Sequence, residues 1–449
     1  MNISINKTQK GVDILLMNEK FSLKYPEKVW NNFSDEMKDF FLDNYLFLKS
    51  VHLPIIQGTD KVILNTSSPL LKTFFLSMQF MDIPNISDSE GIKPEKYFKR
   101  FFNSSFEFAD QEVKHPWLNL NADENSSVLS FSFGKESLLG TAVSKEIGLD
   151  PHPVWIEEKG APVENKFKEQ LSKKFNKEIG IVIEHILNET MLLHKFDFLD
   201  ISSKIKYSLS HLLTEYMLLL IPFLYNYNAK YLLLGNEKSC SVPYINEYGY
   251  KCYPAFDQTI EWTKELNNMI KIIFGDKFHL CSLLEPIHEL AIIKILHKRY
   301  PEFAKYQYSC FPDESTSIKN ERWCCNCTKC ARMYIFFKAF NIDVSKLGFK
   351  EDMLSKNYTN YFSIFKTSDR RFMYDTSGLG RDEQLLAFYL AYKNGVKGDL
   401  IEEFKKIFLN EIKEREDDLI KEFLKIHDSF TIPKKIKQKT LSIYKEELD

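Results

Sequence analysis

The sequence predicts an α/β fold built on a doubly wound, five-stranded parallel sheet. From about residue 125, short runs rich in Leu, Ile, Val and aromatic residues recur along the chain, and segments with helical periodicity separate them. Strands that alternate with helices form parallel sheets with both faces covered. Helical regions are expected to be added before and after this unit.

The expected strands and helices follow one another from residue 128 onward. The strands are residues 128–132, 153–156, 181–185, 231–234 and 278–284. The helices are residues 138–147, 165–176, 208–227 and 286–297. In a sheet of this kind ligands bind at the carboxyl ends of the strands, so the segments after the first and fourth strands are expected to face one crevice.

The flanking regions are less regular. Residues 1–122 form an N-terminal region with a candidate strand at 61–64 and an apolar helix at 68–81, and with no motif that carries chemistry. Residues 123–345 form the central α/β domain. Residues 346–449 form a C-terminal region in which Lys, Glu, Ile and Leu at helical spacing predict charged helices that pack on the core. We expect Gly378-Leu379-Gly380 to be a loop.

The composition and net charge limit the kinds of partner that we expect this protein to bind. The 449 residues are 44% hydrophobic and 27% charged with a net charge of −2, which provides no basic field for nucleic acid. The most apolar stretch, residues 216–227, is too short to span a bilayer, and the first 20 residues lack the apolar core of a signal peptide. We therefore expect a cytoplasmic protein with a small-molecule substrate and neither a nucleic-acid nor a membrane partner. A homodimer is left open.

A polar turn joins the first expected strand to the first expected helix. Its sequence is Ser132-Phe133-Gly134-Lys135-Glu136-Ser137. A turn of this kind presents backbone N–H groups at a helix start, where the helix dipole favours negative charge, and the lysine adds a cation. The segment therefore predicts a site for the phosphates of a nucleotide.

Cysteines gather between residues 310 and 330, and none precedes Cys240. Two residues separate Cys324 from Cys327 and Cys327 from Cys330, a spacing that lets one turn of backbone wrap a tetrahedral ion. With Cys310 upstream, four thiolates would close the shell of a structural Zn²⁺. Cys325 is left off the set of ligands because only one residue separates it from Cys327.

Together the two motifs resemble those of the PP-loop (N-type) ATP pyrophosphatases, whose signature after the first strand of a HUP-like sheet is Ser-Gly-Gly-x-Asp-Ser. In this chain Phe133 occupies the position of the first glycine, and Glu136 occupies that of the aspartate. The likeness covers roughly residues 125–345 and is greatest to the 7-cyano-7-deazaguanine synthase-like branch, which carries a four-cysteine zinc site. Residues 322–330 (Arg-Trp-Cys-Cys-Asn-Cys-Thr-Lys-Cys) are also similar to muramoyl-peptide glutamate epimerases.

The resemblance implies an ATP-dependent reaction. A carboxylate or amide oxygen of a deazapurine or other carboxylate-bearing metabolite would attack the α-phosphate of ATP and release pyrophosphate, with Mg²⁺ to neutralise it. The loop would bind pyrophosphate through Ser132, Ser137 and the backbone of Phe133 and Gly134. Lys135, Glu136 and Ser137 would be the catalytic residues, with Lys135 on the phosphates and Glu136 on Mg²⁺.

Further candidates follow from position in the expected sheet. Trp155 to Glu157, at the end of the second strand, would contact adenosine. Gly235, Asn236 and Glu237, after the fourth strand, would contact the acceptor or the α-phosphate. Three polar residues are secondary candidates: Asp257, Gln258 and Arg322. We expect His288 and Glu289, on helix 286–297, to belong to the core or the surface and not to the catalytic site.

Three other functions stay open. One is a UDP-muramoyl-peptide glutamate epimerase-like enzyme. Another is a tRNA sulfur transferase, for which Cys240 and Cys252 would be the catalytic thiols. The third is a non-catalytic zinc-binding adaptor in which the nucleotide loop has decayed.

Overall fold

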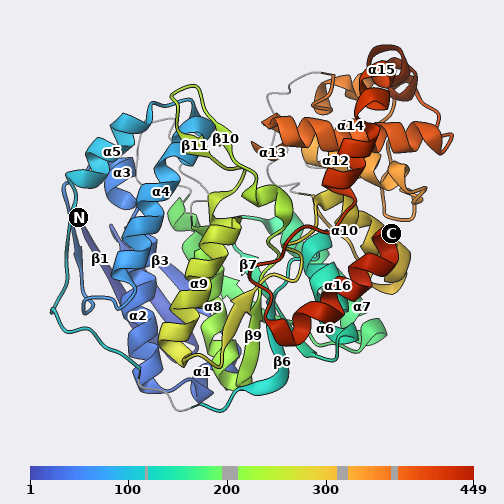
Figure 1. The fold of residues 1–449 in the computed structure, drawn as a ribbon. Helices are drawn as coiled ribbons and strands as arrows, with labels where there is room; N and C mark the ends of the chain where they lie inside the picture. Colours follow the sequence, from blue (N-terminus) through green and yellow to red (C-terminus); the bar gives the residue numbers. More distant parts are fainter. Residues whose placement is uncertain (117–119, 195–210, 311–321, 366–372) are drawn as a thin grey trace.

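A ten-stranded, mostly parallel sheet runs through the protein in the computed structural model, which describes residues 1–116, 120–194, 211–310, 322–365 and 373–449 (Figure 1). Its strand order is β12-β9-β6-β7-β8-β3-β2-β1-β4-β5. A separate two-stranded sheet pairs β10 (Tyr244–Ile245) with β11 (Lys251–Cys252).

All five expected strands are present and form a contiguous parallel block. They are β6 (Asp123–Ser130), β7 (Asp150–Glu158), β8 (Glu184–Asn188), β9 (Ala229–Leu233) and β12 (His279–Cys281). Each pairs in parallel with its neighbour. β6 lies between β7 and β9, so the strand order reverses there, which is where ligands bind in sheets of this class.

The expected limit of five strands is wrong, because the N-terminal region extends the same sheet. It contributes β1 (Asn2–Thr8), β2 (Gly11–Leu16), β3 (Glu19–Lys24), β4 (Lys61–Leu64) and β5 (Ser105–Glu107). The connection is antiparallel, with Leu23 opposite Asn188 and Lys24 opposite Leu187. The N-terminal region therefore contains strands as well as helices, whereas a mainly helical region was expected.

The alternation of buried and more exposed side chains explains why these extra segments form strands. Ile3 and Ile5 of β1, and Val12, Ile14 and Leu16 of β2, are buried at every second position. Met17 and Asn18 then adopt positive φ values of 49° and 70°, the backbone of a tight hairpin turn that reverses the chain into β3.

Helices cover both faces of the sheet. Leu129, Trp155 and Leu233 face one core, and their neighbours Val128, Val154 and Leu232 face the other. The first core takes helices α6 (Lys135–Glu146), α7 (Pro162–Ile179), α10 (Glu289–Arg299) and α11 (Pro301–Ala304). The second takes α1 (Glu27–Asn32), α2 (Asp35–Ser50), α3 (Leu53–Gln57), α4 (Lys72–Glu90), α5 (Pro94–Phe102), α8 (Leu212–Tyr227) and α9 (Ile260–Phe274).

Helix α12 (Thr328–Ala339), near the end of the central domain, and the helices of the C-terminal region also pack on the first core. The C-terminal helices are α13 (Met373–Thr376), α14 (Gly378–Lys393), α15 (Asp399–Phe423) and α16 (Lys434–Leu448). The expected loop at Gly378-Leu379-Gly380 is wrong. These residues begin α14, where the Gly380 N–H donates to Ser377 Oγ over 3.0 Å and caps the helix.

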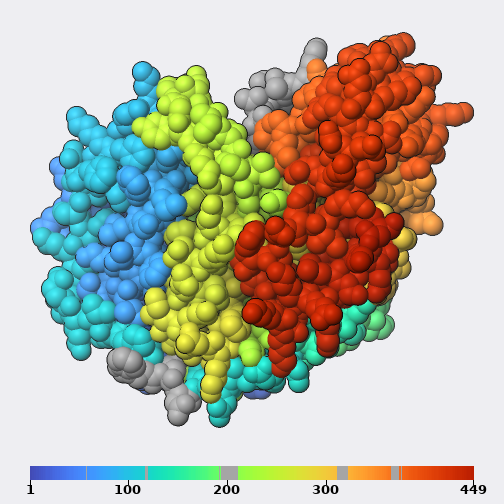
Figure 2. Space-filling view, in the orientation of Figure 1, coloured from blue at the N-terminus to red at the C-terminus, as the bar shows by residue number. Residues whose placement is uncertain are grey.

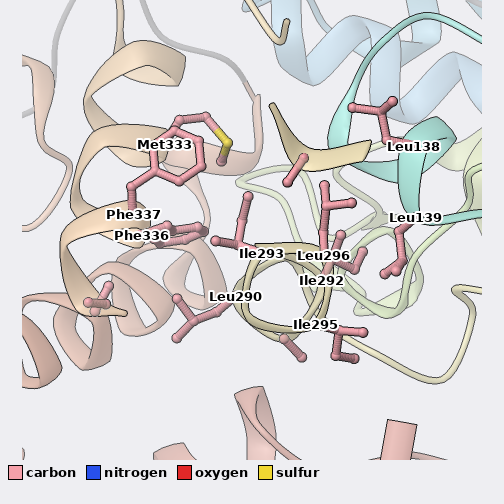
Figure 3. Packing of buried hydrophobic residues seen from close by; sticks show 14 of the residues in the cluster. Leu138, Leu139, Leu290, Ile292, Ile293, Ile295, Leu296, Met333, Phe336 and Phe337 are labelled. Carbon is pink, nitrogen blue, oxygen red and sulfur yellow. The ribbon is translucent and has the colours of Figure 1, made fainter. Parts of the chain in front are cut away.

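Helix α10 is the centre of this side of the molecule. Leu138 and Leu139 of α6 approach it from one side, and Met333 and Phe336 of α12 from the other (Figure 3). Helix α16 returns to cover it, and Tyr444 Oη donates to the main-chain oxygen of Leu283 over 2.9 Å. Figure 2 shows the C-terminal residues, in red, covering the middle of this face.

Short 3₁₀ segments connect the larger elements. They are η1 (Thr190–His194), η3 (Lys238–Ser241), η4 (Phe256–Gln258) and η6 (Lys356–Tyr361). Among the helices of the described ranges, none combines the length and the apolar character that a membrane crossing requires.

Candidate functional site

The loop between β6 and α6 folds over the start of the helix, as the sequence predicts. Gly134 is the N-cap of α6. The Ser132 N–H donates to Ser137 Oγ over 3.2 Å, and that hydroxyl donates to the Gly134 carbonyl over 3.1 Å. The Gly134 N–H donates to Ser132 Oγ over 3.3 Å. The two hydroxyls therefore brace the turn, and the first N–H groups of the helix have no acceptor within the helix itself.

Phe133 contributes a left-handed backbone conformation to this loop, and its ring packs in the core. Its φ of 61° lies in the left-handed region, where a glycine would be unstrained. Its ring is fully buried, with its centroid 4.8 Å from that of Phe131 and 6.0 Å from that of Phe175. Its carbonyl accepts the N–H of Tyr308 over 2.8 Å. The phenyl group therefore points into the core while the backbone keeps the turn.

Three carboxylates surround the ammonium group of Lys135. Lys135 Nζ contacts Glu136 Oε1 and lies 2.5 Å from Glu289 Oε1, and its side chain is 2% exposed. Glu136, Glu237 and Glu289 each place one carboxylate oxygen within 4.8 Å of the others. Burial acts to lower the pKa of Lys135, but the three carboxylates outweigh it and raise the pKa, so Lys135 is charged. We call Lys135, Glu136, Glu237 and Glu289 the Lys135 cluster.

The pKa values of Glu237 and Glu289, two carboxyl groups of this cluster, shift in opposite directions. Burial raises the pKa of Glu237 well above its usual value, although Lys135 offsets part of the effect. Glu237 Oε2 is buried and has no hydrogen-bond partner among the described residues. Burial also acts to raise the pKa of Glu289, but Arg332 and Lys135 lower it below its usual value. These shifts favour the ionised form of Glu289 and the protonated form of Glu237.

Glu289 is 3% exposed, as expected for a residue of the core, but it also belongs to the Lys135 cluster. It occupies the first turn of α10, and α10 packs against α6, so its carboxylate reaches Lys135. An acidic residue in a first helical turn is common and gives no signal of its own in sequence. The neighbouring His288 is fully buried and accompanies it at the N-cap.

Helix α12 brings cations that sequence analysis missed. Arg332 Nε lies 2.8 Å from Glu289 Oε2, an ion pair without hydrogen-bond alignment, and its Nη1 contacts Asp375. Lys329 lies close enough for the charges of Glu136 and Glu289 to raise its pKa, although burial lowers it overall. The spacing 329/332 could have been a signal, because residues three apart share a helix face.

The segment after β9 meets the loop after β6, as the strand order predicts. A Cβ on Gly235 would lie 3.0 Å from the Cβ of Glu136, so a larger residue would have to push Glu136 back by a few tenths of an ångström. Asn236 Nδ2 donates to Thr263 Oγ1 over 2.8 Å, while its Oδ1 is buried without a hydrogen-bond partner among the described residues. A small pocket lies at this junction, lined by Ser130, Glu136, Ser137, Leu234 and Gly235 among others.

Trp155 lies on the α6 side of the sheet in β7 and is 4% exposed. Its ring centroid is 4.8 Å from that of His185, and its Nε1 is buried without a hydrogen-bond partner among the described residues. Glu157 Oε2 lies 2.6 Å from His185 Nε2. These residues end β7 next to the β6 loop.

Four cysteine sulfurs form a compact cluster in front of α12. Cys324 Sγ lies 3.8 Å from Cys327 Sγ and 3.7 Å from Cys330 Sγ, and Cys330 Sγ lies 3.7 Å from Cys310 Sγ. The Cys324 N–H donates to Cys310 Sγ and the Cys330 N–H to Cys327 Sγ. All four are buried and none forms a disulfide. The cluster could hold a metal ion. Cys325 turns the chain between the ligands with a φ of 50°.

The secondary candidates have structural bonding in this fold. Arg322 Nε donates to the carbonyl of Gln307 over 3.0 Å, and its Nη2 donates to that of Lys305 over 2.8 Å. Asp257 Oδ2 accepts the N–H of Leu213 over 2.8 Å at the start of α8. Gln258 Oε1 accepts from Cys240 Sγ over 3.4 Å.

Cys240 and Cys252 are buried thiols. Burial raises the pKa of Cys240 well above its usual value and that of Cys252 to about 12. A thiol with a raised pKa carries little of the thiolate form that acts as a nucleophile.

Comparison with known proteins adds no identification. No protein-family model matches the chain, and no curated protein matches it either.

Proposed function

We propose that this protein is an adenylating enzyme of the PP-loop type, which activates a carboxylate or amide with ATP and releases AMP and pyrophosphate. One observation carries the proposal. The start of α6, where the first N–H groups have no acceptor within the helix, lies with a buried lysine and three carboxylates at the point where the strand order reverses. Buried charges are costly, and they gather where chemistry requires them.

The donor set of the Lys135 cluster suits Mg²⁺. Three carboxylates close together offer the hard oxygen ligands that Mg²⁺ prefers, and Glu237 has an oxygen without a partner among the described residues. Glu136, Glu237 and Glu289 would hold the ion. When bound, Mg²⁺ would neutralise the charge on the departing pyrophosphate.

The residues around this set have separate roles. The N–H groups at the start of α6 bind phosphate oxygens, with Ser132 and Ser137 holding the turn that presents them. Lys135 supplies a positive charge to the phosphates. Arg332 keeps Glu289 ionised, and Lys329 adds a cation from α12. Trp155 and Asn236 border the site with unsatisfied polar atoms that a nucleotide or acceptor could bind.

The zinc proposal rests on distances. Four thiolates about 2.3 Å from a tetrahedral Zn²⁺ lie about 3.8 Å from one another. Three sulfur–sulfur contacts, of 3.7 to 3.8 Å, match this value. The sulfurs of Cys310, Cys324 and Cys330 all lie within 4.8 Å of one another, and Cys327 Sγ joins them through its contact with Cys324. Cys310, Cys324, Cys327 and Cys330 would therefore hold Zn²⁺ in a closed structural site. Free thiols of this kind persist in a reducing compartment, which supports a cytoplasmic location.

Among acceptors, we propose a small carboxylate or a deazapurine, as in 7-cyano-7-deazaguanine synthase-like enzymes. A muramoyl-peptide glutamate epimerase-like reaction would use the same ATP chemistry. The raised pKa of Cys240 counts against a sulfur transferase. The buried, charged Lys135 cluster counts against a non-catalytic adaptor, in which nothing would maintain it.

The test is ATP binding and pyrophosphate exchange. Wild-type protein with Mg²⁺ should bind ATP, measured by calorimetry, and should release pyrophosphate with an accepted carboxylate from a substrate panel. Lys135→Met and Glu136→Gln should lower both by at least about tenfold, since each removes a charge that contacts phosphate or metal. Lys145→Met is the control, because Lys145 is exposed on the same helix. Equal ATP binding by wild type and Lys135→Met, with both folded, would refute the proposal.

A further inference from the structure

A second group of metal-ligating side chains lies away from the cysteines. His288 is the N-cap of α10, Glu422 is near the end of α15, and His427 lies between α15 and α16. His288 Nε2 lies 3.0 Å from Glu422 Oε1. One donor atom from each of the three residues lies within 4.8 Å of the others. His288 and His427 are 139 positions apart in the sequence, yet their side chains lie close together.

From this grouping we propose a second transition-metal site, formed by His288, Glu422 and His427, that takes Zn²⁺. Two histidine nitrogens and one carboxylate oxygen are a donor set of Zn²⁺, whereas Mg²⁺ and Ca²⁺ take oxygen ligands. Ligands about 2.0 to 2.1 Å from a tetrahedral ion lie about 3.3 Å apart. The 3.0 Å between His288 Nε2 and Glu422 Oε1 is close to this value, and the third donor atom, within 4.8 Å of the other two, needs a shift of at most about 1.5 Å.

Each histidine ring is held through one nitrogen by a neighbouring group, as metal-ligating histidines usually are. His288 Nδ1 lies 2.9 Å from Ser239 Oγ, which leaves Nε2 for the metal. The ring of His427 is fixed through Nε2, which lies 2.7 Å from the main-chain oxygen of Glu422. The His427 N–H donates to the Pro286 carbonyl over 2.8 Å, so the two loops are joined before any ion binds.

The site has one open side. His288 is fully buried, whereas the side chain of Glu422 is 40% exposed, so an ion can enter from solvent. Three protein ligands leave the fourth position to water, as in open zinc sites. Lys238, whose charge reaches both His288 and Glu422, is the neighbouring cation that the ion must tolerate.

A bound ion would join the C-terminal segment to the start of α10. His288 precedes Glu289, which contacts Lys135, so the ion would fix the helix turn that carries a member of the Lys135 cluster. The site is independent of the ATP proposal, because its ligands are other residues.

Cobalt substitution tests the site without relying on activity. Metal-free full-length protein is titrated with Co²⁺ and then with Zn²⁺, and bound metal is counted by elemental analysis. Excess Mg²⁺ is kept in the buffer to occupy the carboxylates of the Lys135 cluster, the third group that could bind Co²⁺. Under these conditions we expect two Co²⁺ or Zn²⁺ ions per chain: one with the intense thiolate charge-transfer absorption of the cysteine cluster, and one without it. Glu422→Gln and His427→Ala should each leave the thiolate absorption and weaken the second site by about 10- to 100-fold.

Glu414→Gln, at an exposed position of the same helix, is the matched control and should bind two ions. A double change of Cys324 and Cys330 to Ser should remove the thiolate absorption and keep the second ion. One ion per wild-type chain, or two ions in Glu422→Gln and His427→Ala, would overturn the proposal. Circular dichroism of each variant checks that it is folded.

Discussion

In the loop between β6 and α6, the backbone and the side chain of Phe133 have different roles. Phe133 adopts a conformation that suits glycine, yet its ring is buried between Phe131 and Phe175. Left-handed backbone costs a non-glycine residue about 1 to 2 kcal/mol. A buried phenyl group contributes more, since its removal costs about 3 to 5 kcal/mol. The packing therefore outweighs the strain.

Replacing Phe133 with glycine should reveal this balance. We expect Phe133→Gly to lower the free energy of unfolding by about 2 to 4 kcal/mol, because lost packing exceeds relieved strain. ATP affinity of the folded fraction should change less than about threefold, since only the backbone faces the loop. Urea denaturation and calorimetry measure the two quantities.

Phe102→Ala is the control, because Phe102 is 69% exposed, and it should change the unfolding free energy by less than about 0.5 kcal/mol. A Phe133→Gly variant more stable than wild type would show that strain dominates the loop.

Helix α12 serves two sites at once. Cys327 and Cys330 stand at its start in the cysteine cluster, while Lys329 and Arg332 reach the carboxylates. Because residues one apart on a helix point in different directions, one turn presents ligands to one side and cations to the other. An ion held by the cysteines would therefore fix the helix that orients the cations.

Metal loss should therefore weaken nucleotide binding at a distance. We expect Cys324→Ser, or removal of the metal by a chelator, to lower the melting temperature by several degrees and ATP affinity by about tenfold, because α12 loses its fixed start. Differential scanning calorimetry and titration calorimetry measure these effects.

The matched control is Cys325→Ser, which changes a buried cysteine outside the cluster of four. It should retain the metal and ATP affinity. Full ATP affinity in metal-free protein would mean that α12 is held by its packing alone.

The sequence sufficed for elements whose signal is local. Lys135, Glu136 and Gly235 could be placed because strand ends in a parallel sheet meet at one edge, and the cysteines because their spacing is characteristic. Glu289 could not be placed, since only helix packing brings it to Lys135, 154 residues earlier in the chain. Arg332 had only the weak signal of its spacing from Lys329 on one helix face. In the N-terminal region the strand expected at residues 61–64 is present as β4, whereas β1 to β3 were not predicted because they form a hairpin array without intervening helices.

At the scale of the whole molecule, buried ionisable groups join the N-terminal helices to the central sheet. Lys49 of α2 pairs with Glu215 of α8 over 2.8 Å, with both side chains nearly inaccessible. Nearby, Asp82 of α4 lies close to Asp257 of η4. Burial, together with the charge of Asp257, raises the pKa of Asp82 to about 8, and burial raises that of Asp257 to about 6.

These shifts give the stability a pH dependence with a definite sign. In the folded state the two carboxyls keep protons that the unfolded chain releases near pH 4, so stability falls as pH rises from about 4 to 8. Asp82→Asn should remove most of this fall and be more stable than wild type at pH 8, by on the order of 3 kcal/mol. Urea denaturation between pH 5 and 8 measures it.

Asp417→Asn, at an exposed position of α15, should follow the wild-type curve. Parallel curves for wild type and Asp82→Asn would show that Asp82 is ionised in the folded protein.

The return of α16 to α10 has a consequence for the order of assembly. During synthesis the last residue of α10, Arg299, precedes the first residue of α16, Lys434, by 135 residues. At roughly 5 to 20 residues per second, that interval lasts about 7 to 27 s. Throughout it the apolar surface of α10 that packs against α16 has no cover from that helix. We therefore expect slower elongation to lengthen the exposure of this surface and to increase aggregation of the nascent chain.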